Sequence, residues 1–199
     1  MAGEIPLWIK IAYTLMVAVI VPVYLAYYGP ANFLWFSDVA LVVTGVALWL
    51  ESPLLVSMMT VGVLLPELLW NVTLFTRLVT GIRVSGLADY MFDTRIPKWI
   101  RALSLFHVVL PVLMLWMLHR LGYDPRALPA QTALAWVILP LTYAVTKPED
   151  NINWVYGPGA RPQRQISPPL YLAFVLILFP LIVYVPTHLL LLAALGGER

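Results

Sequence analysis

The chain has 199 residues, of which 61% are hydrophobic and only 11% are charged, and its mean hydropathy is +0.86. Soluble domains carry roughly 25% charged residues, so this composition excludes an ordinary soluble domain. The net charge of +2 arises from basic residues scattered along the chain, which excludes a nucleic-acid-binding surface and a nucleic-acid partner. The chain has no cysteine, which excludes disulfides, thiolate chemistry and cysteine-ligated metal centres.

Apolar runs close to the length that crosses a bilayer recur six times along the sequence. We therefore predict an all-α membrane protein, a bundle of six transmembrane helices that forms a single domain over residues 1–199. The first run is too long for the apolar region of a signal peptide, so we interpret it as a retained helix. The predicted spans cover residues 7–28, 32–50, 54–78, 99–121, 131–146 and 170–195.

Prolines lie inside five of these six runs. Each removes a backbone hydrogen bond and tends to bend its helix, which membrane helices tolerate when neighbouring groups satisfy the freed carbonyl. We expect several kinked helices, and a bundle of bent helices encloses a cavity more readily than a straight one. The prolines are Pro22, Pro66, Pro111, Pro140, Pro180 and Pro186.

An even number of spans places both termini on one side of the membrane. Four basic residues fall on that side and eight fall on the other, where the connections 79–98 and 147–169 lie. The positive-inside rule then predicts that these two connections are cytoplasmic and that both termini are outside.

The run at residues 54–78 carries a carboxylate at membrane depth, Glu67. Such a group costs roughly 2.5 to 3.5 kcal/mol on insertion scales, so it is normally neutralised, paired or turned towards the protein interior. Ser57, Thr60, Glu67 and Asn71 follow one another at helical spacing. We predict that they form one stripe that faces protein.

Four polar residues reach a similar depth on neighbouring helices. At about 1.5 Å per residue, Asp38, Glu67, Asn71 and His107 lie roughly 9 to 17 Å below the face that carries the long connections. We predict that they meet in one pocket under an ordered cap formed by residues 151–159.

Burial of carboxyl groups beside an imidazole suits acid–base chemistry. The candidate catalytic residues are Glu67 as general acid, His107 as base or proton shuttle, and Asp38 as the partner that orients His107. The candidate substrate-binding residues are Asn71, Ser104, Asn151, Asn153 and Trp154.

Purely structural roles are an alternative for two of these residues. Asp38 could pair with Arg77 or Arg101, and His107 could bind a carbonyl freed by a proline.

No predicted helix carries two histidines at ligand spacing, so neither a metal site nor a cofactor is predicted.

Three segments resemble a family of bacterial integral membrane proteins that are described only as membrane or membrane-associated proteins. They are YGPANFLWFSD (28–38), LLPELLWN (64–71) and NINWVYGPG (151–159). The resemblance implies a multi-pass protein of the bacterial cytoplasmic (inner) membrane, and it carries no activity, cofactor or catalytic residue.

Three functions remain compatible with the sequence. The first is a protein that handles a lipid or isoprenoid through an intramembrane polar pocket, with membrane lipids as partners. The second is an accessory or structural subunit of a larger membrane complex, whose polar stripe binds other membrane-protein subunits. The third is a small proton-coupled carrier. The sequence leaves open whether the protein is an enzyme.

Overall fold

The computed structural model describes residues 4–159 and 161–195. Over these residues the chain is helical and contains no β-strand. The all-α prediction is therefore confirmed, together with the presence of several apolar helices of membrane length. Five helical stretches are long and apolar enough to cross a membrane: α1 (Leu7–Tyr27), α3 (Pro53–Thr80), Lys98–Leu121, α6 (Ala127–Val145) and Pro168–Leu195.

The second predicted span is shorter than expected. A 3-10 turn, η1 (Pro30–Leu34), is followed by extended Trp35, and helix α2 (Phe36–Leu50) begins four residues after the predicted start at residue 32. The chain turns sharply after α1 because Gly29 adopts a φ of 83°, a conformation that glycine reaches without strain. At 1.5 Å per residue, α2 is about 22 Å long, which is less than the roughly 30 Å of a bilayer core.

The later spans also differ from the prediction in detail. A tight turn at Ser104 and Leu105 divides the predicted span 99–121 into α4 (Lys98–Leu103) and α5 (Phe106–Leu121). Helix α6 begins at residue 127 instead of 131. Pro129 is tolerated in its first turn, because an N–H there would have no intrahelical partner. The last span continues through α7 (Pro168–Phe179), the π-helical turn η4 (Pro180–Tyr184) and α8 (Val185–Leu195).

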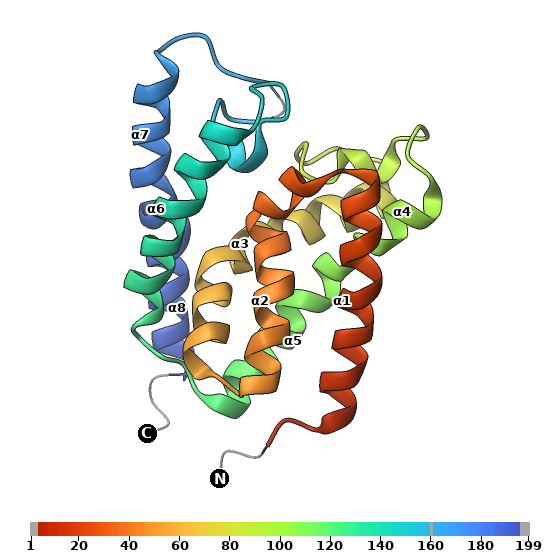
Figure 1. Cartoon of the computed structure of the whole chain (residues 1–199), viewed down its shortest axis with the longest axis vertical. Helices are drawn as coiled ribbons and strands as arrows, with labels where there is room; N and C mark the ends of the chain where they lie inside the picture. The colour runs from red at the N-terminus through yellow and green to blue at the C-terminus, as the bar shows by residue number, and fades with distance from the viewer. Residues whose placement is uncertain (1–3, 160, 196–199) are drawn as a thin grey trace.

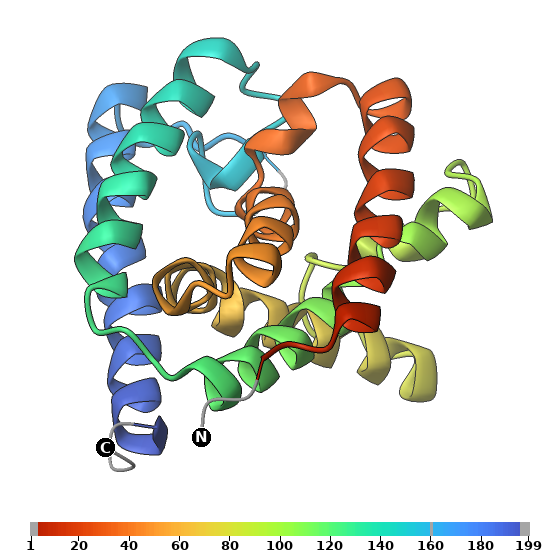
Figure 2. The same ribbon diagram turned by 60° about the horizontal axis from the view of Figure 1, so that its bottom comes forward.

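Helix α3 is the centre of the bundle. The Ser52 hydroxyl caps its start, and Gly81, with a left-handed φ of 75°, ends it. It packs against α2, α5, α6, η4 and α8, and Figure 2 shows α2 and α3 surrounded by α1, α5, α6 and α8. The polar stripe predicted on this helix is buried, with Ser57, Thr60 and Glu67 at most 2% exposed.

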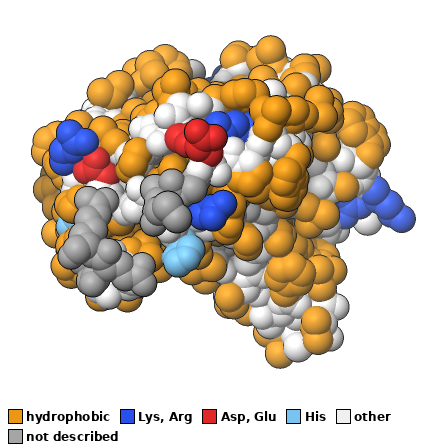
Figure 3. Space-filling view, turned by 90° about the horizontal axis from the view of Figure 1, so that it is seen from below, with side chains coloured by type: hydrophobic (Ala, Val, Ile, Leu, Met, Phe, Trp, Pro, Cys, Tyr) orange, Lys and Arg blue, Asp and Glu red, His pale blue; other side chains and the backbone are white. Residues whose placement is uncertain are grey.

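The two ends of the bundle differ in character. The start of α1 and the end of α8 lie at the bottom of Figure 1, and the described parts of the long connections, 81–97, 146–159 and 161–167, lie towards the top. These connections contain η2 (Asp89–Phe92) and η3 (Ile152–Trp154). The bottom end, seen in Figure 3, shows a few charged side chains among mostly hydrophobic ones.

Exposed apolar side chains on the outward helix faces suit a hydrocarbon environment; they include Leu15, Val112, Val137, Leu181 and Ile182.

Candidate functional site

A cavity of about 1010 Å³ lies between α2, α3 and α5 on one side and α7 and η4 on the other. Both long connections contribute to its rim, through Arg83 and Asp150 among others. Most of its lining is aromatic or aliphatic. This size and lining suit a sizeable lipophilic molecule, because ligand pockets usually measure roughly 300 to 1,000 Å³.

The cavity also reaches the side of the bundle. Helix α3 packs against η4 and α8, whereas Val175 and Phe179 of α7 line the cavity. Leu69, Leu178 and Ile182 line it too, and they are 46%, 44% and 61% exposed. The wall of the cavity between α3 and the α7–η4 stretch is therefore apolar and partly exposed.

The side chains of Glu67 and His107 contact each other at this cavity, at a distance typical of an ion pair. Nδ1 of His107 lies 2.8 Å from Oε2 of Glu67, and the Glu67 side chain is only 3% exposed. The imidazole stacks against Trp70 and Phe106, with ring centroids 4.6 and 4.1 Å away. A carboxylate that accepts the Nδ1 proton leaves Nε2 of a neutral imidazole as a base. Nε2 makes no hydrogen bond to any described residue.

Asn71 does not line the cavity, and its side chain hydrogen-bonds the backbone of Glu67 and of His107 instead. Its Nδ2 donates to the His107 carbonyl at 2.7 Å and to the Glu67 carbonyl at 2.8 Å. The His107 carbonyl is the one that Pro111 leaves without its helical donor. Asn71 therefore joins α3 to α5 and holds the backbone of His107, in place of the predicted contact with substrate.

Asp38 lies in the first turn of α2, lines the cavity and is 4% exposed. Asn32 Nδ2 donates to its Oδ2 at 3.2 Å, while Oδ1 has no hydrogen-bond partner within the described part of the chain. Glu67, and not Asp38, holds the imidazole of His107. The predicted role of Asp38 in orienting His107 is therefore corrected: Glu67 makes that contact, and Oδ1 of Asp38 is a buried atom without a hydrogen-bond partner among the described residues.

The basic residues considered as partners of Asp38 are engaged elsewhere. Arg77 pairs with Asp89 at 2.7 Å, and Arg101 donates to the Met91 carbonyl at 2.6 Å. Both interactions hold the connection 81–97 against the helices. The structural alternative of an Asp38–arginine pair is therefore absent from this structure.

The cap over the cavity is built around two asparagines. Asn153 accepts the Phe36 N–H at 3.1 Å and donates to the Leu34 carbonyl at 2.6 Å, so it fixes the start of α2. Asn151 donates to two carbonyls of its own loop and accepts a third bond from it. Both asparagines and Trp154 line the cavity with positive φ angles of 40°, 51° and 57°, a strained conformation that these contacts maintain.

Ser104 lines the cavity together with two tyrosines, Tyr24 and Tyr90, that were not among the predicted site residues. Its Oγ lies 2.6 Å from the Tyr24 hydroxyl, and Tyr90 of η2 also lines the cavity. Burial raises the pKa of Tyr90, which keeps its phenol protonated. Trp70 follows Glu67 by three residues, so helical spacing could have identified it. No sequence pattern places the two tyrosines.

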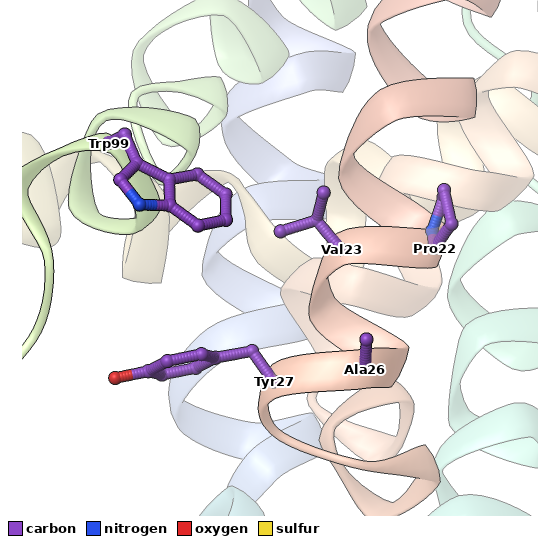
Figure 4. Close-up of a pocket in the computed structure, with 5 residues that line it drawn as sticks. All are labelled: Pro22, Val23, Ala26, Tyr27 and Trp99. Atoms are coloured by element: carbon purple, nitrogen blue, oxygen red, sulfur yellow. The ribbon is translucent and has the colours of Figure 1, made fainter.

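A second, shallower hollow of about 340 Å³ lies on the outside between α1 and α4 (Figure 4). In this view Trp99 faces Val23, and the ring of Tyr27 lies below them. The lining of this hollow contains no carboxyl or imidazole group. Its lining consists of Pro22, Val23, Ala26, Tyr27 and Trp99.

Comparison with protein-family models, curated proteins and solved structures finds no match to this chain. Within residues 4–159 and 161–195, no group of three or more His, Cys, Asp or Glu residues could hold a metal ion. The candidate site is therefore defined by the geometry of the cavity and of the polar groups that line it.

Proposed function

We propose that this protein binds a lipid or isoprenoid in the large cavity and that His107, held by Glu67, exchanges a proton with it. The observation that carries the proposal is a large, mostly apolar cavity with a buried carboxylate–imidazole pair in its wall. A carboxylate-oriented imidazole is a common general base, and general acid–base catalysis contributes typically about 10²- to 10⁴-fold in rate. The apolar rim between α3 and α7 supplies a path from the bilayer.

We propose that the protein lies in a bacterial cytoplasmic membrane, as the resemblance to bacterial membrane proteins implies. It crosses the membrane six times, with η1 and α2 together forming the second crossing. The excess of basic residues around connections 79–98 and 147–169 supports a cytoplasmic position for them and an external position for both termini.

The natural absence of cysteine makes this orientation simple to test. Gln165→Cys and Glu4→Cys each introduce one thiol at an exposed position, on opposite ends of the bundle. An impermeant maleimide added to intact cells should label the residue-4 variant and spare the residue-165 variant until the membrane is permeabilised. The reverse labelling pattern would invert the proposed orientation.

Native mass spectrometry of protein extracted gently from its own membrane tests the proposed ligand. Wild-type protein should carry a discrete lipophilic molecule, and Glu67→Gln, which keeps the side-chain shape but removes the charge, should lose or replace it. Glu51→Gln is the matched control, because it removes a carboxylate from an ion pair with Lys10 at the other end of α2. A ligand-free protein with stoichiometric protein partners, unchanged by Glu67→Gln, would instead favour an accessory subunit.

A further inference from the structure

The charged side chains that line the cavity favour one charge on the polar head of a ligand over the other. Two basic side chains line it: Arg83, which shares Asp89 with Arg77 at the rim, and His107, which contacts Glu67 inside. Three carboxylates line it, namely Asp38, Glu67 and Asp150. Acidic side chains therefore outnumber basic ones in the lining, and this excess disfavours a phosphate or carboxylate head.

Asp38 is the carboxylate least satisfied by the protein itself. Its side chain is 4% exposed, and one of its two oxygens, Oδ1, has no donor among the described residues. The other oxygen receives only the amide of Asn32. A buried carboxylate oxygen without a donor is unfavourable, so a ligand that brings both a hydrogen-bond donor and a positive charge stabilises it.

Aromatic side chains surround this part of the cavity. Tyr24 and Tyr28 from the end of α1 line it, and so do Trp35 and Phe36 from the start of α2. The rings of Tyr24 and Tyr28 pack edge to face with centroids 5.2 Å apart. Aromatic faces attract cations within about 6 Å, and they do so more strongly where water is excluded.

We infer that the ligand is an amphiphile with a protonated amine head, held between Asp38 and the aromatic side chains of the α1–α2 hairpin. Its hydrocarbon part lies along the apolar wall that Val175, Leu178 and Phe179 provide on α7. The inference rests on the proposed function, because it assumes that a lipophilic molecule occupies the cavity. Asp150, which forms no ion pair with a described residue, adds a further negative charge at the rim.

Three probes with one hydrocarbon chain and different heads test this inference: hexadecylamine, hexadecanol and palmitate. Each is titrated into the full chain in nanodiscs of zwitterionic phospholipid, and binding is followed by tryptophan fluorescence and by native mass spectrometry. The amine should bind roughly tenfold or more tightly than the alcohol and the carboxylate, the gain expected of a charge-assisted hydrogen bond. Asp38→Asn should reduce the affinity for the amine to that for the alcohol, whereas Glu51→Gln should leave it unchanged.

The outcomes separate the inference from the proposed function. Saturable binding of the alcohol or of palmitate that equals or exceeds binding of the amine overturns the amine head but leaves a lipophilic ligand in the cavity. Absence of saturable binding for all three probes contradicts both. The ranking of the probes is measured on the wild-type protein, so it decides the question even if Asp38→Asn fails to fold.

Discussion

Replacing Asn71 with leucine should destabilise the protein, and replacing Pro111 with alanine should remove most of that cost. Asn71 Nδ2 donates at 2.7 Å to the His107 carbonyl, which Pro111 leaves without its helical donor. Leucine has a similar volume but leaves this carbonyl unpaired. An unpaired buried polar group costs about 1 to 3 kcal/mol, whereas hydrogen bonds between membrane helices average about 0.6 and reach about 1.7 kcal/mol. We therefore expect Asn71→Leu to cost about 1 to 2 kcal/mol.

Alanine at position 111 restores an N–H that can pair with the His107 carbonyl inside α5. In that background the cost of Asn71→Leu should fall below about 0.5 kcal/mol, which gives a coupling energy of about 1 kcal/mol. The assay is a double-mutant cycle, measured by reversible unfolding in mixed detergent and SDS micelles and followed by circular dichroism. An equal cost of Asn71→Leu in both backgrounds would refute the reasoning, because Asn71 would then not act through this carbonyl.

Three further predictions use the same unfolding assay. Asn153→Ala should cost about 2 to 6 kcal/mol, since it strips partners from one buried and one partly buried backbone group at about 1 to 3 kcal/mol each. Asn153→Asp keeps the acceptor for Phe36 but sets a carboxylate oxygen against the Leu34 carbonyl, so it should cost at least as much, and a clearly smaller cost would contradict this account. Trp136→Phe should cost about 1 kcal/mol, because the indole donates at 3.1 Å to the carbonyl of residue 176 that Pro180 leaves free; an unchanged stability would show that this bond contributes nothing. The Lys10 ammonium and a backbone N–H lower the pKa of Glu51 below its ordinary 4.5, so the folded state binds fewer protons than the unfolded chain. Stability from this ion pair should be present above about pH 4.5 and be lost as the pH falls through the lowered pKa, and Glu51→Gln should remove that part of the acid sensitivity.

Much of the candidate site could be predicted because helical geometry converts spacing into position. The offsets between Ser57, Thr60 and Glu67 define one face of a helix, and burial of an intramembrane carboxylate follows from the cost of exposing it to lipid. A rise of about 1.5 Å per residue from the shared end of the bundle predicts that Asp38, Glu67 and His107 lie at a similar depth. In the structure all three line one cavity. These inferences needed only local rules.

The start of α2 could not be predicted, because it depends on a distant part of the chain. Asn153 lies 117 positions after Phe36 and accepts its N–H, which ends the 3-10 turn and fixes where the helix begins. The connection 81–97 likewise folds back because Ala88 packs with Trp70 and Leu74. Contacts of this kind leave no periodic pattern in the sequence, so the predicted loop gave no sign that Tyr90 reaches the cavity.

Roles in backbone hydrogen bonding account for many of the polar side chains in this bundle. Asn71 and Trp136 donate to carbonyls that prolines leave free, Ser52 caps α3, and Asn153 caps α2. The side chains of Glu67 and His107 contact each other and make no hydrogen bond to a backbone group, and one oxygen of Asp38 has no hydrogen-bond partner in the described part of the chain. In hydrocarbon, where each unpaired polar group is costly, such groups are retained most readily when a ligand or a proton uses them. This contrast makes Asp38, Glu67 and His107 the residues at which function is best sought.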